Sequence, residues 1–198
     1  MLRLVSKTIA NKICEKGLVD NEDVSIYTYG LEVLISTVFS FLTIMLIGFL
    51  FSAVFEAVFF LSVLVVLRRF TGGYHAKTYI GCNLSCSLLF ITTLFLNRVL
   101  SFNLVALIII HFLGLIIILL IAPVENINKP LSLSKRRVNK KRAVIACLAL
   151  SMITILLFVI GSKFYSILTI AYIDLLVLLV LGFIISYRLE VKRNEEAT

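Results

Sequence analysis

The run 68–82 holds most of the side chains in this chain that could do chemistry. Its reactive and charged members are Arg68, Arg69, His75, Lys77 and Cys82, with a Gly72-Gly73 pair between them. A cysteine is a strong nucleophile as a thiolate, which forms when a base or a cation lies beside it. The run therefore predicts thiol chemistry at Cys82, with His75 as base and the cations favouring the thiolate or holding a substrate carboxylate.

The spacing of His75 and Cys82 requires a break in the backbone between them. On one straight helix, a separation of seven residues places them about 10 Å apart along the axis, whereas proton transfer needs about 2.6–3.2 Å. Glycines at 72, 73 and 81 permit such an excursion. We expect Cys82 to open the helix that follows, where the positive end of the helix dipole favours an anionic sulfur.

The composition is that of an integral membrane protein. The 198 residues are 61% hydrophobic and 15% charged, against about 45–50% and about 25% in soluble domains. A spanning helix needs about 20 apolar residues, so we expect one membrane domain, residues 1–198. The net charge of +8 is explained by positive cytoplasmic loops, and no aromatic-basic interleaving suggests nucleic acid.

Six apolar runs predict an all-α, polytopic helical bundle. They cover residues 31–51, 53–67, 82–96, 104–122, 143–160 and 166–187. The second and third runs are short, and Glu56 lies near the start of the second. Four spans with two short or re-entrant segments are therefore the alternative.

The distribution of charge predicts that both termini are cytoplasmic. With six spans, every Lys and Arg except Arg98 and Lys163 falls on one side of the membrane, as the positive-inside rule requires. Run 68–82 lies on that side in the four-span alternative too. Non-helical backbone within a membrane must lie against protein or water, so we expect the site at the inner interface.

Two basic segments flank the spans. Residues 1–20 lack the apolar core and cleavage site of a secretory signal. Apolar and basic residues alternate there at helical spacing, which predicts that residues 1–25 are an amphipathic cytoplasmic segment on anionic headgroups, with a solvated leader as the alternative. Residues 124–142 follow Pro123 and are predicted to be a basic cytoplasmic loop. We interpret this loop as a topology determinant at lipid phosphates, with an acidic partner as the alternative.

Other reactive side chains are interpreted as structural. Cys14, Cys86 and Cys147 have neither disulfide nor metal-ligand spacing, so we expect reduced packing thiols. His111 and Asp174 lie inside apolar runs. We expect each to be hydrogen-bonded to a neighbouring helix, with a proton or substrate relay at Asp174 as the alternative.

The pattern resembles the accessory gene regulator protein B (AgrB) family over essentially the whole chain. The matching residues are Arg68/Arg69, Gly72, Gly73, His75, Ala76, Thr78, Cys82, Ala122-Pro123 and Asn128-Lys129-Pro130. The resemblance implies a cysteine endopeptidase of Gram-positive quorum sensing, located in the cell membrane, with His75 and Cys82 as the catalytic pair. It would remove the C-terminal tail of an AgrD-like peptide precursor through an acyl-thioester and promote closure of a thiolactone or lactone ring.

The resemblance also implies how the precursor binds, because its acidic tail would complement cations of the protein. The candidate substrate-binding residues are Arg68, Arg69, Gly72, Gly73, Lys77, Lys129, Lys135, Arg136 and Arg137. We expect no metal or other cofactor, and we identify no third catalytic residue. A homodimer is expected for so short a chain.

Two other functions stay open from the residues alone. A small transporter or peptide exporter would use Asp174 and the basic loop as its path, and a membrane scaffold would need no reactive group. In either case, Cys82 is a packing residue and His75 an interfacial one. A protease requires one uniquely reactive thiol, whereas a transporter tolerates replacement of all four cysteines.

Overall fold

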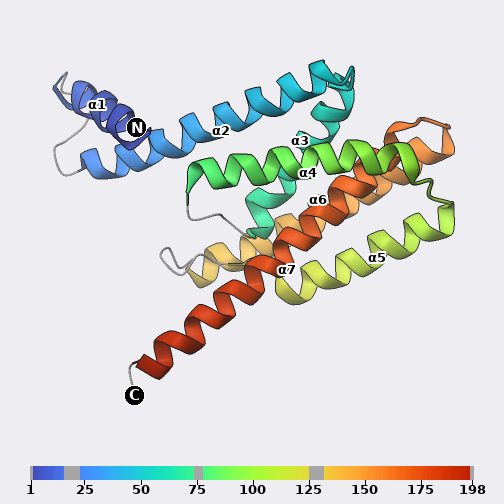
Figure 1. Cartoon of the computed structure of the whole chain (residues 1–198). Coiled ribbons are helices and arrows are strands. Elements are labelled where there is room, and N and C mark those ends of the chain that lie inside the picture. The colour runs from blue at the N-terminus through green and yellow to red at the C-terminus, as the bar shows by residue number, and fades with distance from the viewer. Residues whose placement is uncertain (1, 16–22, 74–77, 125–131, 197–198) are drawn as a thin grey trace.

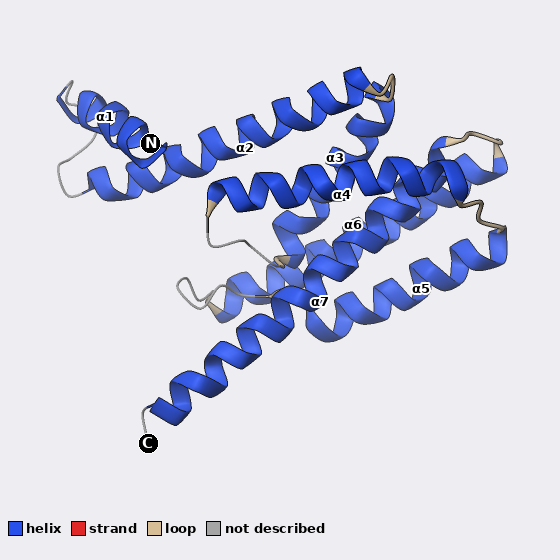
Figure 2. Ribbon diagram, in the orientation of Figure 1, coloured by secondary structure: helices blue, strands red, loops and turns tan. Residues whose placement is uncertain are grey.

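The computed structural model describes residues 2–15, 23–73, 78–124 and 132–196, and its regular elements are α-helices (Figures 1 and 2). They are α1 Leu2–Glu15, α2 Val24–Leu50, α3 Val54–Thr71, α4 Tyr79–Val99, α5 Leu104–Ile121, α6 Leu133–Val159 and α7 Phe164–Glu196. In these ranges, β pairing is confined to one isolated bridge between Gly72 and Val124. The predicted all-α membrane bundle is confirmed.

Each predicted apolar run corresponds to one of the helices α2 to α7, and consecutive helices run in opposite directions (Figure 1). Local chemistry sets their ends. The Asn103 side chain caps α5 by accepting a 2.8 Å hydrogen bond from the Ala106 N–H, and Gly161, with φ 72°, follows the end of α6. The prediction of a loop up to residue 142 was wrong for residues 133–142, which form the first turns of α6 because Lys and Arg are good helix formers.

Five helices are long and apolar enough to cross a membrane, namely α2, α4, α5, α6 and residues 164–189 of α7. Helix α3 has 18 residues, which include Glu56, Arg68 and Arg69. At about 27 Å, it nevertheless lies within the bundle against α2, α6 and α7. The second and third apolar runs were predicted to be short. The third corresponds to α4, which has 21 residues, and the second corresponds to the shorter helix α3.

Helix α7 is the centre of the bundle. It contacts α3, α4, α5 and α6, and 56% of its spanning stretch is buried, against 11% for α2. Its fully buried residues recur at helical spacing, as in Ile167, Ala171 and Leu175. The outer helices turn apolar side chains outward, as lipid contact requires.

Polar side chains inside the bundle pair between helices, as predicted for His111 and Asp174. Nδ1 of His111 on α5 lies 3.1 Å from the Ser151 hydroxyl of α6, and its ring stacks on Tyr172 of α7 with centroids 4.7 Å apart. The Asp174 carboxylate of α7 accepts a 2.5 Å hydrogen bond from the Thr93 hydroxyl of α4. These contacts connect α7 to its neighbours on two sides.

Candidate active site at the start of α4

Cys82 lies in the first turn of α4, which Thr78 caps. The Thr78 hydroxyl accepts a 3.1 Å hydrogen bond from the Gly81 N–H, and its carbonyl accepts one of 3.0 Å from the Cys82 N–H. The half-buried thiol thus lies at the positive end of the helix dipole. The prediction that Cys82 opens this helix is confirmed, with Tyr79 as first residue. A backbone excursion at Gly81 was wrong, because the Thr78 cap holds Gly81 in the helix.

Arg68 brings a cation to the thiols of α4. From the last turn of α3, its Nη1 donates to the Cys86 sulfur at 3.9 Å, and the Cys86 and Cys82 thiols, one helical turn apart, interact. The next residue, Arg69, is exposed. The two arginines predicted to act together therefore separate, with Arg68 at the site and Arg69 at the surface. Cys86, predicted to be a packing residue, borders the site.

The Gly72-Gly73 pair lets three stretches of backbone meet. Both residues have left-handed φ, +70° and +129°, which confirms the predicted backbone excursion. A Cβ on Gly72 would overlap the Val124 carbonyl oxygen, and one on Gly73 would lie 3.3 Å from the Leu178 carbonyl oxygen. The Val124 N–H also donates a 2.9 Å hydrogen bond to the Thr71 carbonyl. The end of α3 is thus joined to the segment after α5 and to the backbone of α7.

The remaining predicted residues divide into two groups. Three lie outside the described residues, and their roles stay predictions: His75, Lys77 and Lys129. Three are exposed on the first turns of α6: Lys135, Arg136 and Arg137. Figure 1 shows that α6 begins at the end of the bundle where α3 ends and α4 begins, so these cations and Cys82 share one end.

Sequence reasoning missed Glu32 of α2. This residue is only 8% exposed, and its carboxylate accepts a 2.9 Å hydrogen bond from the Tyr79 hydroxyl. One turn along α4, the Asn83 amide donates to the Thr43 hydroxyl of α2 at 3.4 Å. The two bonds fix the start of α4 against α2. An acid within an apolar run is costly and marks a functional region, so Glu32 could have been found from the sequence.

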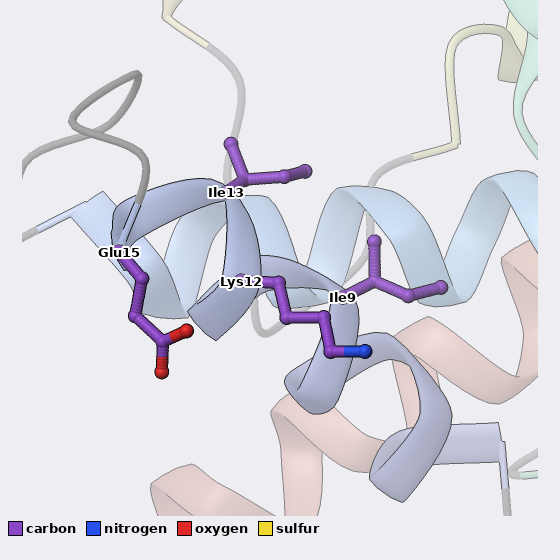
Figure 3. Close-up of a pocket in the computed structure, with 4 residues that line it drawn as sticks. All are labelled: Ile9, Lys12, Ile13 and Glu15. Atoms are coloured by element: carbon purple, nitrogen blue, oxygen red, sulfur yellow. The ribbon is translucent and has the colours of Figure 1, made fainter.

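The described residues contain no group of three His, Cys, Asp or Glu side chains that could hold a metal ion. A shallow pocket on α1 is lined by Ile9, Lys12, Ile13 and Glu15 (Figure 3). Helix α1 packs on α2 through small buried residues, Ser6 and Ala10. The pocket thus belongs to the amino-terminal segment and includes none of the predicted site residues.

Comparison with known proteins finds relatives along nearly the whole chain. The family described as Accessory gene regulator B matches residues 6–189. Two AgrB-like proteins of Clostridium perfringens, from strains 13 and SM101, are each 31% identical to this chain over 166 residues, which cover 80% of this chain and 75% of each relative. No solved structure matches the chain. The family match includes both the run 68–82 and the basic segment 124–142.

Proposed function

Because this chain belongs to the accessory gene regulator B family, we propose that it is a membrane-embedded cysteine endopeptidase that processes an AgrD-like quorum-sensing precursor. Membership of the family supports a part in accessory gene regulation. The observation that carries the proposed reaction is the Cys82 thiol in the capped first turn of α4, with Cys86 beside it and Arg68 in contact with Cys86.

Cys82 is the proposed nucleophile, and His75 is the proposed base. The sulfur attacks the scissile carbonyl while His75 accepts the thiol proton, and collapse of the tetrahedral intermediate breaks the C–N bond as His75 protonates the leaving amine. The tail departs and an acyl-thioester remains on Cys82. His75 is only three residues from Thr78 in the sequence, so the chain keeps the backbones of these two residues within about 11 Å of each other.

Ring closure follows by acyl transfer within the peptide. A thiol or hydroxyl of the bound peptide attacks the thioester carbonyl, forms the thiolactone or lactone, and returns the Cys82 thiol. Water would instead release a linear acid, so the intermediate benefits from shielding. Cys82 is half-buried and lies one turn from Cys86, which contacts Arg68 of α3, and this position supports that shielding. The sequence of steps requires no cofactor.

The cations near Cys82 are proposed to bind the acidic tail of the precursor. Those on α3 and α6 are Arg68, Arg69, Lys135, Arg136 and Arg137, and those assigned by sequence are Lys77 and Lys129. Arg98 and Lys163 adjoin helix ends at the opposite end of the bundle. This asymmetry supports a cytoplasmic site and cytoplasmic termini.

The test is cleavage of a cognate precursor by membranes that contain the wild type or a single variant. We expect Cys82→Ala and His75→Ala to abolish the cut, and mass spectrometry to find the peptide acyl group on Cys82. Cys86→Ala is the matched control, a thiol one turn away that should keep most of the activity. Processing by Cys82→Ala would refute the assignment of the nucleophile.

A further inference from the structure

The basic segment, residues 124–142, contacts the last turn of α3 at both of its ends. At one end, the Val124 N–H donates to the Thr71 carbonyl at 2.9 Å, and Val124 forms the bridge with Gly72. At the other end, the Arg142 guanidinium lies 5.9 Å from the centroid of the Phe70 ring. We call these two contacts the clamp. Three consecutive residues, Phe70 and Thr71 of α3 and its C-cap Gly72, therefore contact both ends of a segment that begins about fifty residues later in the chain.

Each contact depends on the residue type present. Residue 72 has a left-handed φ, and any Cβ there would overlap the Val124 carbonyl oxygen, so only glycine permits the bridge. The distance from Arg142 to Phe70 lies within the roughly 6 Å over which a ring attracts a cation. Thr71 is fully buried, which leaves its carbonyl dependent on the Val124 N–H.

We propose that the clamp makes Phe70, Gly72, Val124 and Arg142 positioning residues that hold the basic segment and the start of the reactive run as one unit. The activity readout of this inference rests on the proposed function. The residues directly after Gly73 lead to His75, so release of the clamp alters where that stretch begins relative to Cys82. The turnover step depends on this placement, whereas peptide binding depends on the charge of the segment. Clamp variants should therefore lower kcat, and loss of a charge such as Arg137→Gln should raise KM.

The side-chain half of the clamp is tested by a double-mutant cycle with Phe70→Leu and Arg142→Gln. We expect each to lower kcat about two- to fivefold, the rate equivalent of one cation–aromatic contact. KM should stay unchanged in Phe70→Leu and rise in Arg142→Gln as in Arg137→Gln, because Arg142 also contributes a charge to the basic segment. The double variant should be no slower than the slower single variant, because the contact is lost once. Lys163→Gln is the matched control, since it removes a contact of 5.7 Å with Phe164 at the opposite end of the bundle and should leave kcat unchanged. The proposal would be overturned if the two losses of kcat multiplied in the double variant, or if kcat were unchanged in both single variants.

The backbone half is tested by Gly72→Ala against Gly161→Ala. Both glycines have a φ near +70°, but nothing lies within 4 Å of a Cβ on Gly161. Both substitutions therefore strain the local backbone, and only Gly72→Ala breaks the clamp. We expect a larger loss of kcat for Gly72→Ala than for Phe70→Leu, and near wild-type kcat for Gly161→Ala. Equal loss in the two glycine variants would show strain alone and refute the role of the bridge.

Limited trypsin digestion measures the clamp without using enzyme activity. Phe70→Leu and Gly72→Ala should speed cleavage after Lys135, Arg136 and Arg137, and Lys163→Gln should not. If the wild-type protein cuts no precursor, the proposed function is refuted, but the rates of trypsin cleavage in the clamp variants still test the clamp. Normal precursor cleavage with unchanged digestion in the clamp variants would refute the clamp alone.

Discussion

Tyr79 lies on α4, three residues before Cys82, and its hydroxyl donates a 2.9 Å hydrogen bond to the buried Glu32 carboxylate on α2. Tyr79→Phe removes this donor from the carboxylate, which costs about 1–3 kcal/mol and loosens the first turn of α4. We expect a lower Tm in detergent and slower precursor cleavage. Tyr27→Phe is the control, because Tyr27 is an exposed tyrosine of α2. Equal effects of the two changes would contradict a specific role for the pair.

Arg68 and Arg69 provide a matched comparison of neighbouring cations. Arg68 contacts the Cys86 sulfur at 3.9 Å, whereas Arg69 is exposed. Arg68→Gln should slow formation of the thioester about tenfold or more, since it removes the charge in contact with Cys86, one helical turn from the reacting Cys82 thiol. Arg69→Gln should slow it less. Single-turnover cleavage and the rate of Cys82 alkylation measure both variants, and a larger loss in Arg69→Gln would reverse the assignment.

Gly114 leaves room for the Tyr172 ring between α5 and α7. A Cβ at this position would overlap the Tyr172 hydroxyl and ring. Gly114→Ala should therefore destabilise the bundle by about 1–3 kcal/mol, seen as a lower Tm. Gly30→Ala is the control, because nothing lies within 4 Å of a Cβ there and alanine favours a helix. An unchanged Tm in Gly114→Ala would show that Tyr172 can move aside.

Variants of the Asp174–Thr93 pair distinguish a structural role of Asp174 from a role in a transport path. Thr93→Val removes a buried hydroxyl that pairs with the carboxylate, and we expect a lower Tm. Thr92→Val, on the exposed face of α4, should change it little. Asp174→Asn can retain a hydrogen bond to Thr93 and should keep precursor cleavage. Loss of peptide export with intact cleavage in Asp174→Asn would revive the exporter hypothesis.

The spans and the setting of Cys82 could be predicted from the sequence because they depend on local patterns. Long apolar runs give membrane helices, and Thr78 is of a residue type that caps the start of a helix. The same reliance on local apolar runs made the predicted start of α6 wrong. Apolarity begins near residue 143, but helical structure begins at Leu133 in charged residues that a search for apolar runs does not include.

The partners of these residues could not be predicted. The bridge between Gly72 and Val124 joins residues far apart in the chain, and the bond between Tyr79 and Glu32 spans 47 positions. No periodicity or motif encodes such pairs, because they arise from how the helices pack. The glycine pair indicated that the backbone must deviate, but only the fold identifies the carbonyl groups of Val124 and Leu178 as the reason.

The contact between Gly73 and the backbone of Leu178 has a consequence for how the protein responds to its lipid environment. Helix α7 is the least lipid-exposed of the five apolar spans, whereas only 11% of the α2 span and 22% of the α5 span are buried. A thicker or thinner bilayer acts first on helices that touch lipid, which tilt or bend to match it. Since Gly73 packs on the backbone of α7, the depth of the Gly72-Gly73 pair in the membrane is set by contact with the central helix and not by contact with lipid.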